Sequence, residues 1–303
     1  MKTFGRIIDR KGNGPEGQRN MNSTNLKNTL DNLYTNYHID YLSTDPLEIV
    51  RRYNDPGDQE IAGFIAASLA LGRADSIKKT VTALLNKMGT SPYRFVFHFD
   101  PDRNKNSFDG FVYRFYRERD VNLLIWWLHQ MIREKGSIKA FFLKGYSEGD
   151  DDIGPSLSRF IQSIRELTTE PFYSSLPPRG SGASHWLTDP ANGSGCKRMN
   201  LFLRWMVRHD GLDLGLWPEV SPSQLIIPLD THIARIGCRI RLTERATPDW
   251  KMAMEITESL RKFDLQDPVK YDFALCRVGM LNVCPDKANT ATCGSCPLFR
   301  FCL

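Results

Sequence analysis

The chain has 303 residues, of which 41% are hydrophobic and 25% charged, a composition typical of a globular protein of one or two domains that buries its own core. No apolar run approaches the roughly 20 residues that a membrane helix needs, and residues 1–20 are too polar for a signal peptide, so we expect a cytoplasmic protein. The net charge of +5 suits an anionic partner such as nucleic acid without requiring one.

The chain opens with residues 1–22, which mix Gly, Arg and Asn without apolar periodicity and are expected to form a disordered tail. Apolar residues then recur at helical spacing, and the aromatic stretch 108–135 is interpreted as packed helix rather than a stacking platform for bases. The segments expected to be helical in this part are 26–34, 60–71, 77–85 and 108–135.

The second half begins with residues 171–195, a long connection rich in Ser, Gly and Pro that is expected to be functional. Thr247-Pro248 and Asp267-Pro268 resemble N-cap and first-turn pairs, and predict two helix starts. Helical spacing recurs in 197–208, 231–242, 248–263 and 268–282. Because almost no alternating strand pattern occurs, the predicted class is all-α.

Seven cysteines in a chain without an export signal argue against a disulfide framework. Cys196, Cys238 and Cys276 are expected to be small buried hydrophobes. The other four form the pattern Cys284-x8-Cys293-x2-Cys296-x5-Cys302, which predicts a four-thiolate centre. One Cys-x-x-Cys flanked by two distant cysteines favours an iron–sulfur cluster over zinc, which commonly uses two close pairs; zinc and unligated thiols remain as alternatives.

This spacing, with Gly294, Ser295 and Pro297 in CGSCPLFRFC, resembles the [4Fe-4S] loop of the endonuclease III branch of the helix-hairpin-helix DNA glycosylases. The first interval is longer by two residues than in typical members. The resemblance implies a two-lobed helical fold in which 23–55 and 198–303 form one lobe and 56–197 the other. DNA would lie across the cleft between them.

The segment IPLDTHIARI, residues 227–236, is similar to the part of that family that carries the catalytic aspartate, and Asp230 matches it. Locally, Asp230 is equally a good helix N-cap. The two roles are compatible, since a helix N-terminus also keeps a carboxylate ionised.

Residues 193–197, GSGCK, resemble the Gly-x-Gly-x-Lys turn of the hairpin, in which glycines let backbone amides approach a DNA phosphate. By that resemblance Gly193 and Gly195 bind DNA and Lys197 is the nucleophile, although such turns are common and Lys197 alone would be taken for a surface residue. The amine must be neutral to attack the sugar, which burial beside cations such as Arg198 would favour, while Asp230 stabilises the developing charge or takes up the amine proton.

The segment before the hairpin and the interval between Lys197 and Asp230 are both longer than in endonuclease III, as in the archaeal 8-oxoguanine glycosylase branch, so the resemblance does not imply a substrate. Five arginines are candidate phosphate contacts, with surface solvation as the alternative for each. His232 and Trp205 are expected to be structural, whereas Trp217 could stack on an extruded base. The five arginines are Arg198, Arg204, Arg208, Arg235 and Arg239.

Together these features predict a monomeric DNA glycosylase, with or without strand-cleaving lyase activity, that acts on damaged duplex DNA. The alternatives are a non-catalytic DNA-binding iron–sulfur protein and a zinc-stabilised nucleic-acid module.

Overall fold

The structure, a computed structural model, describes residues 15–285, 287 and 290–302, and within them the chain is predominantly helical. The strands in this part are β1 (Val112–Tyr113) and β2 (Tyr116–Arg117), which pair antiparallel as one short hairpin. The predicted all-α class is therefore confirmed. None of the described helices combines the length and apolar character needed to cross a membrane.

The elements of the first half surround a core of aliphatic and aromatic side chains. In chain order they are α1 (Pro15–Asn36), η1 (Ile39–Thr44), α2 (Leu47–Val50), α3 (Pro56–Ser68), α4 (Ala74–Lys87), α5 (Pro92–Phe97), β1, β2, α6 (Glu118–Lys135), α7 (Ile138–Leu143) and α8 (Gly154–Glu166).

The second half carries the predicted site residues. Its elements are η2 (Ala183–Trp186), η3 (Pro190–Asn192), α9 (Lys197–Val207), η4 (Pro222–Gln224), α10 (Thr231–Arg239), α11 (Trp250–Arg261), η5 (Pro268–Tyr271), α12 (Asp272–Met280), α13 (Thr290–Cys293) and η6 (Phe299–Phe301).

Two expectations about the first half are corrected. Helix α1 begins at Pro15, so residues 15–22 continue a helix rather than belonging to a tail, whereas residues 1–14 lie outside the described residues. Proline at the first helical position suits this start, because its missing N–H would be unpaired there in any case. The stretch 108–135 is not one helix: Gly110 and Arg114 adopt positive φ, and the hairpin precedes α6.

Of the two proline-based helix starts in the second half, the one at Pro268 is confirmed and the one at Pro248 differs from expectation. Helix α11 is capped by Asp249, whose carboxylate accepts the Met252 N–H at 2.8 Å, and Thr247-Pro248 directly precedes this cap residue. Helix η5 begins at Pro268 with Asp267 at its N-cap position, as predicted. The Asp267 carboxylate makes no cap bond and instead accepts the Arg208 Nε–H with both oxygens, at 2.9 and 3.0 Å.

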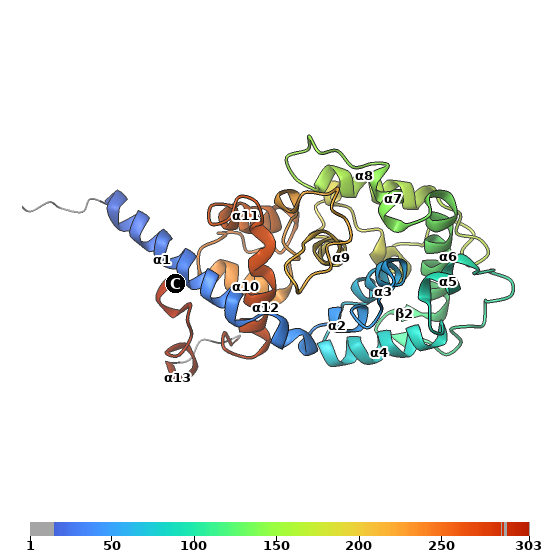
Figure 1. Cartoon of the computed structure of the whole chain (residues 1–303), viewed down its shortest axis with the longest axis horizontal. Coiled ribbons are helices and arrows are strands. Elements are labelled where there is room, and N and C mark those ends of the chain that lie inside the picture. The colour runs from blue at the N-terminus through green and yellow to red at the C-terminus, as the bar shows by residue number, and fades with distance from the viewer. Residues whose placement is uncertain (1–14, 286, 288–289, 303) are drawn as a thin grey trace, which may run out of the picture.

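Figure 1 shows α1, α10, α11 and α12 gathered on one side and α3 to α8 on the other, with α9 between them. Helix α12 packs on α10 and α1, while α9 packs on α3. Since α9 contacts the helices of 56–197, the predicted division into lobes at residue 197 stays a prediction. The arrangement leaves the N-terminus of α9 where the two groups of helices meet.

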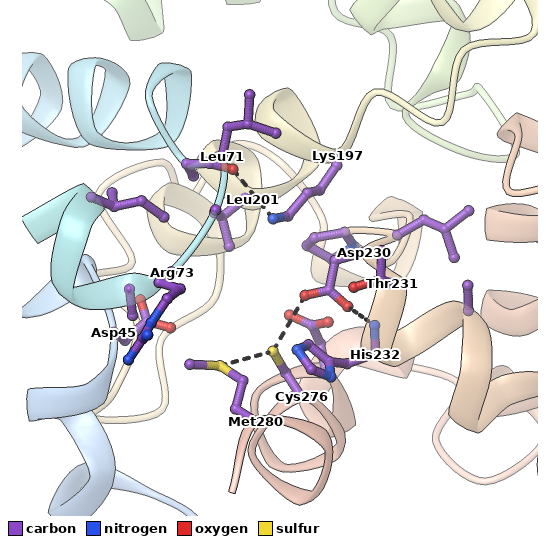
Figure 2. A pocket seen from close by; sticks show the side chains of 18 of the residues that line it. Asp45, Leu71, Arg73, Lys197, Leu201, Asp230, Thr231, His232, Cys276 and Met280 are labelled. Carbon is purple, nitrogen blue, oxygen red and sulfur yellow. Dashed lines mark hydrogen bonds between the residues drawn. The ribbon is translucent and has the colours of Figure 1, made fainter. Parts of the chain in front are cut away.

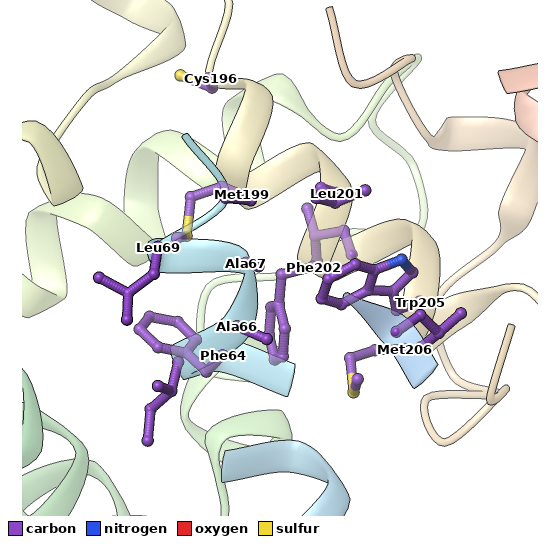
Figure 3. Close-up of a cluster of buried hydrophobic side chains, with 14 of the residues drawn as sticks. Phe64, Ala66, Ala67, Leu69, Cys196, Met199, Leu201, Phe202, Trp205 and Met206 are labelled. Carbon is purple, nitrogen blue, oxygen red and sulfur yellow. The ribbon is translucent and has the colours of Figure 1, made fainter. Parts of the chain in front are cut away.

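The contact between α3 and α9 is aromatic and close (Figure 3). The rings of Phe64 and Phe202 lie edge to face, 5.1 Å apart. A Cβ at Gly63 would lie 2.8 Å from Met206 Cε, so glycine permits this approach. Trp205 is fully buried, as expected. Truncating Phe64 or Phe202 would cost about 3–5 kcal/mol and would loosen the helix that carries Lys197.

Arg204 and Arg208 are buried, so the expectation of surface solvation is wrong for both, and a phosphate contact of either stays a prediction. Each is at most 2% exposed, and both guanidinium groups pair with Asp213. Arg204 also pairs with Asp272 on α12, and Arg208 with Asp267. Removing one partner of such a buried pair typically costs about 3–5 kcal/mol, because the other charge stays in the core. The Arg204–Asp272 pair joins α9 to α12.

Candidate functional site

A pocket of about 1170 Å³ opens where the end of α3 and the start of α4 face α10 and α12. Lys197, at the first residue of α9, and Asp230, which precedes α10, both line it. Figure 2 shows their side chains extending into the same space from different elements. The structure therefore brings together the two residues predicted to carry the chemistry, 33 positions apart in the sequence.

Lys197 is placed by the hairpin before it. Gly193 (φ 78°) and Cys196 (φ 43°) are both left-handed, and Cys196 occupies the N-cap position of α9. The Gly193 carbonyl accepts the Trp250 N–H at 3.0 Å, which fixes the turn on α11. The Lys197 amine, half-buried, donates to the Ala70 carbonyl at 3.3 Å across the pocket wall.

The two predicted hairpin glycines have different roles. Gly193 is exposed and needs glycine for its backbone conformation. Gly195 lies near Asp249, and a Cβ there would make an ordinary contact at 3.6 Å with the backbone. Contact of either with a phosphate stays a prediction.

Asp230 caps α10 as its local sequence predicted. Its Oδ1 accepts the His232 and Ile233 N–H groups at 2.9 and 2.8 Å. This leaves Oδ2 for another partner, and the Cys276 thiol lies 3.5 Å from it. One oxygen is thus fixed by the helix N-terminus while the other faces the pocket. The cap is confirmed, and the catalytic role stays a prediction.

Cys276, expected to be a small buried hydrophobe, lines the pocket instead. Burial, and then the Asp230 carboxylate, raise the pKa of its thiol well above the usual value, so it is protonated at neutral pH and acts as the S–H donor. Met280 Sδ lies 3.6 Å away on its other side. Sequence reasoning missed this residue because 46 positions separate it from Asp230.

Asp272 is a second pocket-lining residue that the sequence analysis did not predict. Burial raises its pKa to about 6; Arg204 opposes this rise and the nearby Asp230 adds to it. Asp272 pairs with Arg204, which also lines the pocket, so the pocket borders the buried ion pairs of α9.

The other three arginines predicted to bind DNA, Arg198, Arg235 and Arg239, also make contacts within the protein. Arg198 hydrogen-bonds the Tyr116 hydroxyl and the His185 carbonyl. Arg235 donates to the Cys284 carbonyl at 2.8 Å, and Arg239 to the Cys284 sulfur at 3.0 Å. Arg235 and Arg239 therefore hold the cysteine loop on α10, and a contact of any of the three with DNA stays a prediction.

Two other residues of this region have structural roles. His232 Nδ1 accepts a hydrogen bond from Arg235 Nη2 at 3.1 Å, and the ring packs on Gly279, where a Cβ would lie 2.6 Å from it. Trp217, considered for base stacking, is fully buried and donates to Glu60 at 2.8 Å, so it cannot stack on a base.

The four predicted metal ligands lie close to one another. Burial raises the pKa of the Cys302 thiol, and the neighbouring Cys296, Cys284 and Cys293 sulfurs add to this rise. Within residues 15–285, 287 and 290–302, no three His, Cys, Asp or Glu side chains converge tightly enough to hold a metal ion as they stand. The chemistry of four thiols, with an Arg239 N–H directed at the sulfur of Cys284, nevertheless suits a sulfur-ligated centre.

Comparison with known proteins gives one match. Residues 45–281 match the model of a family described as "Protein of unknown function (DUF2400)". Neither the curated proteins nor the solved structures contain a match. The matched region includes every pocket-lining residue except Ser43 and Thr44, and it ends before Cys284.

Proposed function

The chain belongs to the DUF2400 family, whose description assigns no activity, and from the pocket itself we propose that it is a DNA glycosylase of the helix-hairpin-helix type. Lys197 would act as nucleophile and Asp230 as its acidic partner on a damaged nucleotide. Strand cleavage by a lyase step would follow from the same covalent intermediate.

One observation carries this proposal: Lys197 and Asp230 line a single pocket (Figure 2). An amine and a carboxylate held by separate rigid elements can act together on one carbon atom, because neither has to reorganise during the reaction. The amine is held by the Ala70 carbonyl, and the carboxylate by two backbone N–H groups.

The chemistry follows from these positions. The neutral Lys197 amine forms a bond to C1′ of the sugar as the bond from C1′ to the base breaks, and the base leaves with that electron pair and is then protonated. Positive charge develops on the sugar in this step. Asp230 is well placed to stabilise it, because its Oδ2 faces the pocket. The attached amine then loses a proton and its electron pair expels O4′ as the C1′–O4′ bond breaks. O4′ takes up a proton, the sugar ring opens and the imine is formed.

We propose that Cys284, Cys293, Cys296 and Cys302 hold a [4Fe-4S] cluster, with zinc as the alternative. When bound, the metal centre would cross-link the C-terminal loop and so stabilise the fold. It has no part in the step at C1′. Iron with acid-labile sulfide in the purified protein supports the cluster, whereas stoichiometric zinc without iron contradicts it.

Borohydride trapping on a duplex with an abasic site tests the function. Reduction of the Lys197 imine would yield a stable protein–DNA adduct, which Lys197→Ala would abolish and Lys79→Ala, at an exposed residue of α4, would not. A native protein that binds the duplex without forming an adduct would instead be the non-catalytic DNA-binding protein. Equal trapping by Lys197→Ala would remove the nucleophile assignment.

A further inference from the structure

The β1–β2 hairpin turns in two residues, Arg114 and Phe115, between the paired residues Tyr113 and Tyr116. Arg114 has φ 55°, a conformation that such turns usually give to Gly, Asn or Asp. Its guanidinium lies against Gly72, where a Cβ would come within 2.4 Å of Nη2. A strained residue that persists at a turn is a reason to look for a function there.

The hairpin is hydrogen-bonded to residues 68–71, the segment that also accepts the hydrogen bond of the Lys197 amine. The Tyr113 hydroxyl donates to the Leu71 carbonyl at 2.6 Å, and the Tyr116 hydroxyl to the Ser68 carbonyl at 3.3 Å. Ala70, between them, accepts the Lys197 amine. The turn and the predicted nucleophile thus share one support.

The long loop 171–195 supports the hairpin from its other side. Asp120 accepts the Arg117 N–H from the hairpin and the Ala183 N–H from the loop, at 2.8 and 2.9 Å. The Phe115 ring lies on the His185 ring, with centroids 4.2 Å apart. Burial, and then Arg198, lower the pKa of His185, so this ring is uncharged at neutral pH. The loop holds the aromatic side chain in one orientation.

The outer surface of the tip combines apolar and cationic groups. Phe115 is 37% and Val112 64% exposed, although both are large apolar side chains. Arg114 and Arg117 are exposed beside them, as is Arg73 at the start of α4. Arg73 and Arg114 also line the pocket that contains Lys197. An exposed aromatic ring surrounded by arginines therefore stands at the pocket rim.

Duplex DNA presents the complementary surface, because it has anionic phosphates outside and stacked apolar bases inside. A base can reach the pocket only after leaving the stack, and the gap must then be filled or closed. We propose that this hairpin is a DNA-contacting element: Phe115 stacks in the duplex beside the extruded nucleotide, and Arg73 and Arg114 contact its phosphates. The inference rests on the proposed function only in taking damaged duplex as the ligand of the pocket.

Binding to an uncleavable probe tests it: a duplex with a tetrahydrofuran abasic analogue and 2-aminopurine as the adjacent base. Native protein should change the 2-aminopurine fluorescence, and Phe115→Ala should remove that change and weaken binding by about tenfold. Phe115→Ala should bind the same strand without its complement with nearly the affinity of the native protein. Leu265→Ala, at a 65% exposed leucine outside the pocket, is the matched control.

Arg114→Gly separates function from folding. Glycine adopts φ 55° without strain, so the melting temperature should stay equal or rise. Binding to the duplex should nevertheless fall and its salt dependence become shallower, because a phosphate contact is lost. Arg103→Ala, at a highly exposed arginine, should change neither property.

The results distinguish this inference from the proposed function, because the probe cannot form an imine. If the native protein forms no borohydride adduct but the hairpin variants bind the probe weakly, the glycosylase proposal is refuted and the DNA-contacting role of the hairpin is supported. If the native protein forms the adduct normally but Phe115→Ala binds the probe as Leu265→Ala does, only the DNA-contacting role of the hairpin is refuted. The role of the hairpin would also be refuted if Phe115→Ala lost equal affinity for the single strand and the duplex, or if the native protein did not bind the duplex.

Discussion

Asp230→Asn separates the two roles of this residue, because asparagine keeps the cap and removes the charge. The side-chain oxygen can still accept the His232 and Ile233 N–H groups, which now lie 2.9 and 2.8 Å from Oδ1. What is lost is the interaction of a full negative charge with the helix N-terminus, about 0.3–1 kcal/mol. The free energy of unfolding should therefore fall by less than about 1 kcal/mol, or about 2–4 °C in melting temperature.

Catalysis should respond much more strongly to the same change. Loss of the group that faces developing charge typically slows an enzyme on the order of 100-fold or more. Single-turnover base release and the rate of borohydride trapping measure this loss, and substrate affinity measured separately should change little.

Asp230→Ala is the matched comparison, since it removes the cap as well and should cost about 1–2 kcal/mol of stability. If Asp230→Asn keeps its melting temperature and also turns over within a few-fold of the native rate, Asp230 is a structural cap and the assignment of its catalytic role is refuted.

Two further predictions concern titrating groups. Because burial and the Asp230 charge raise the pKa of Cys276, Asp230→Asn should speed its alkylation by iodoacetamide, measured at that peptide by mass spectrometry; an unchanged rate would contradict the contact. The pKa of Asp210 lies well below its usual value of 3.8, because the Arg208 charge overcomes the opposing effect of burial. A lowered pKa contributes stability that is present above the usual value and is lost as pH falls below it. The free energy of unfolding of the native protein, measured with urea, should therefore fall between about pH 4 and 2, and that of Asp210→Asn should fall less steeply. Equal slopes for the two proteins would refute the assignment to Asp210.

Local sequence predicted the helices and the cap of α10 because those features depend on neighbours within a few residues. Asp230 before an apolar-periodic run could be recognised as an N-cap, and its carboxylate makes both N–H bonds. The same local reasoning failed at Thr247-Pro248, where Asp249 competes two residues later with a stronger acceptor.

Interactions between distant segments could not be predicted in this way. Arg204 lies in a continuous apolar helix, which suggests burial, but its partner Asp272 is 68 residues further on and follows no motif. The contact between Cys276 and Asp230 is equally remote in sequence. In the stretch 108–135, the aromatic residues indicated packing, yet the tight turn depends on Arg114, a residue type that does not predict positive φ.

The two halves of the site are supported by different parts of the chain, and this decides how each should respond to damage of the fold. Asp230 lies at one end of α10, and Arg239 near the other end binds Cys284, so loss of order in the cysteine loop would act first on the carboxylate. Lys197 instead depends on α9, the turn at Gly193 and the Ala70 carbonyl, which are held by hydrogen bonds to other segments than the described residues of that loop. Substituting Cys296 should therefore disturb the Asp230 side of the pocket while leaving Lys197 and the β1–β2 hairpin in place.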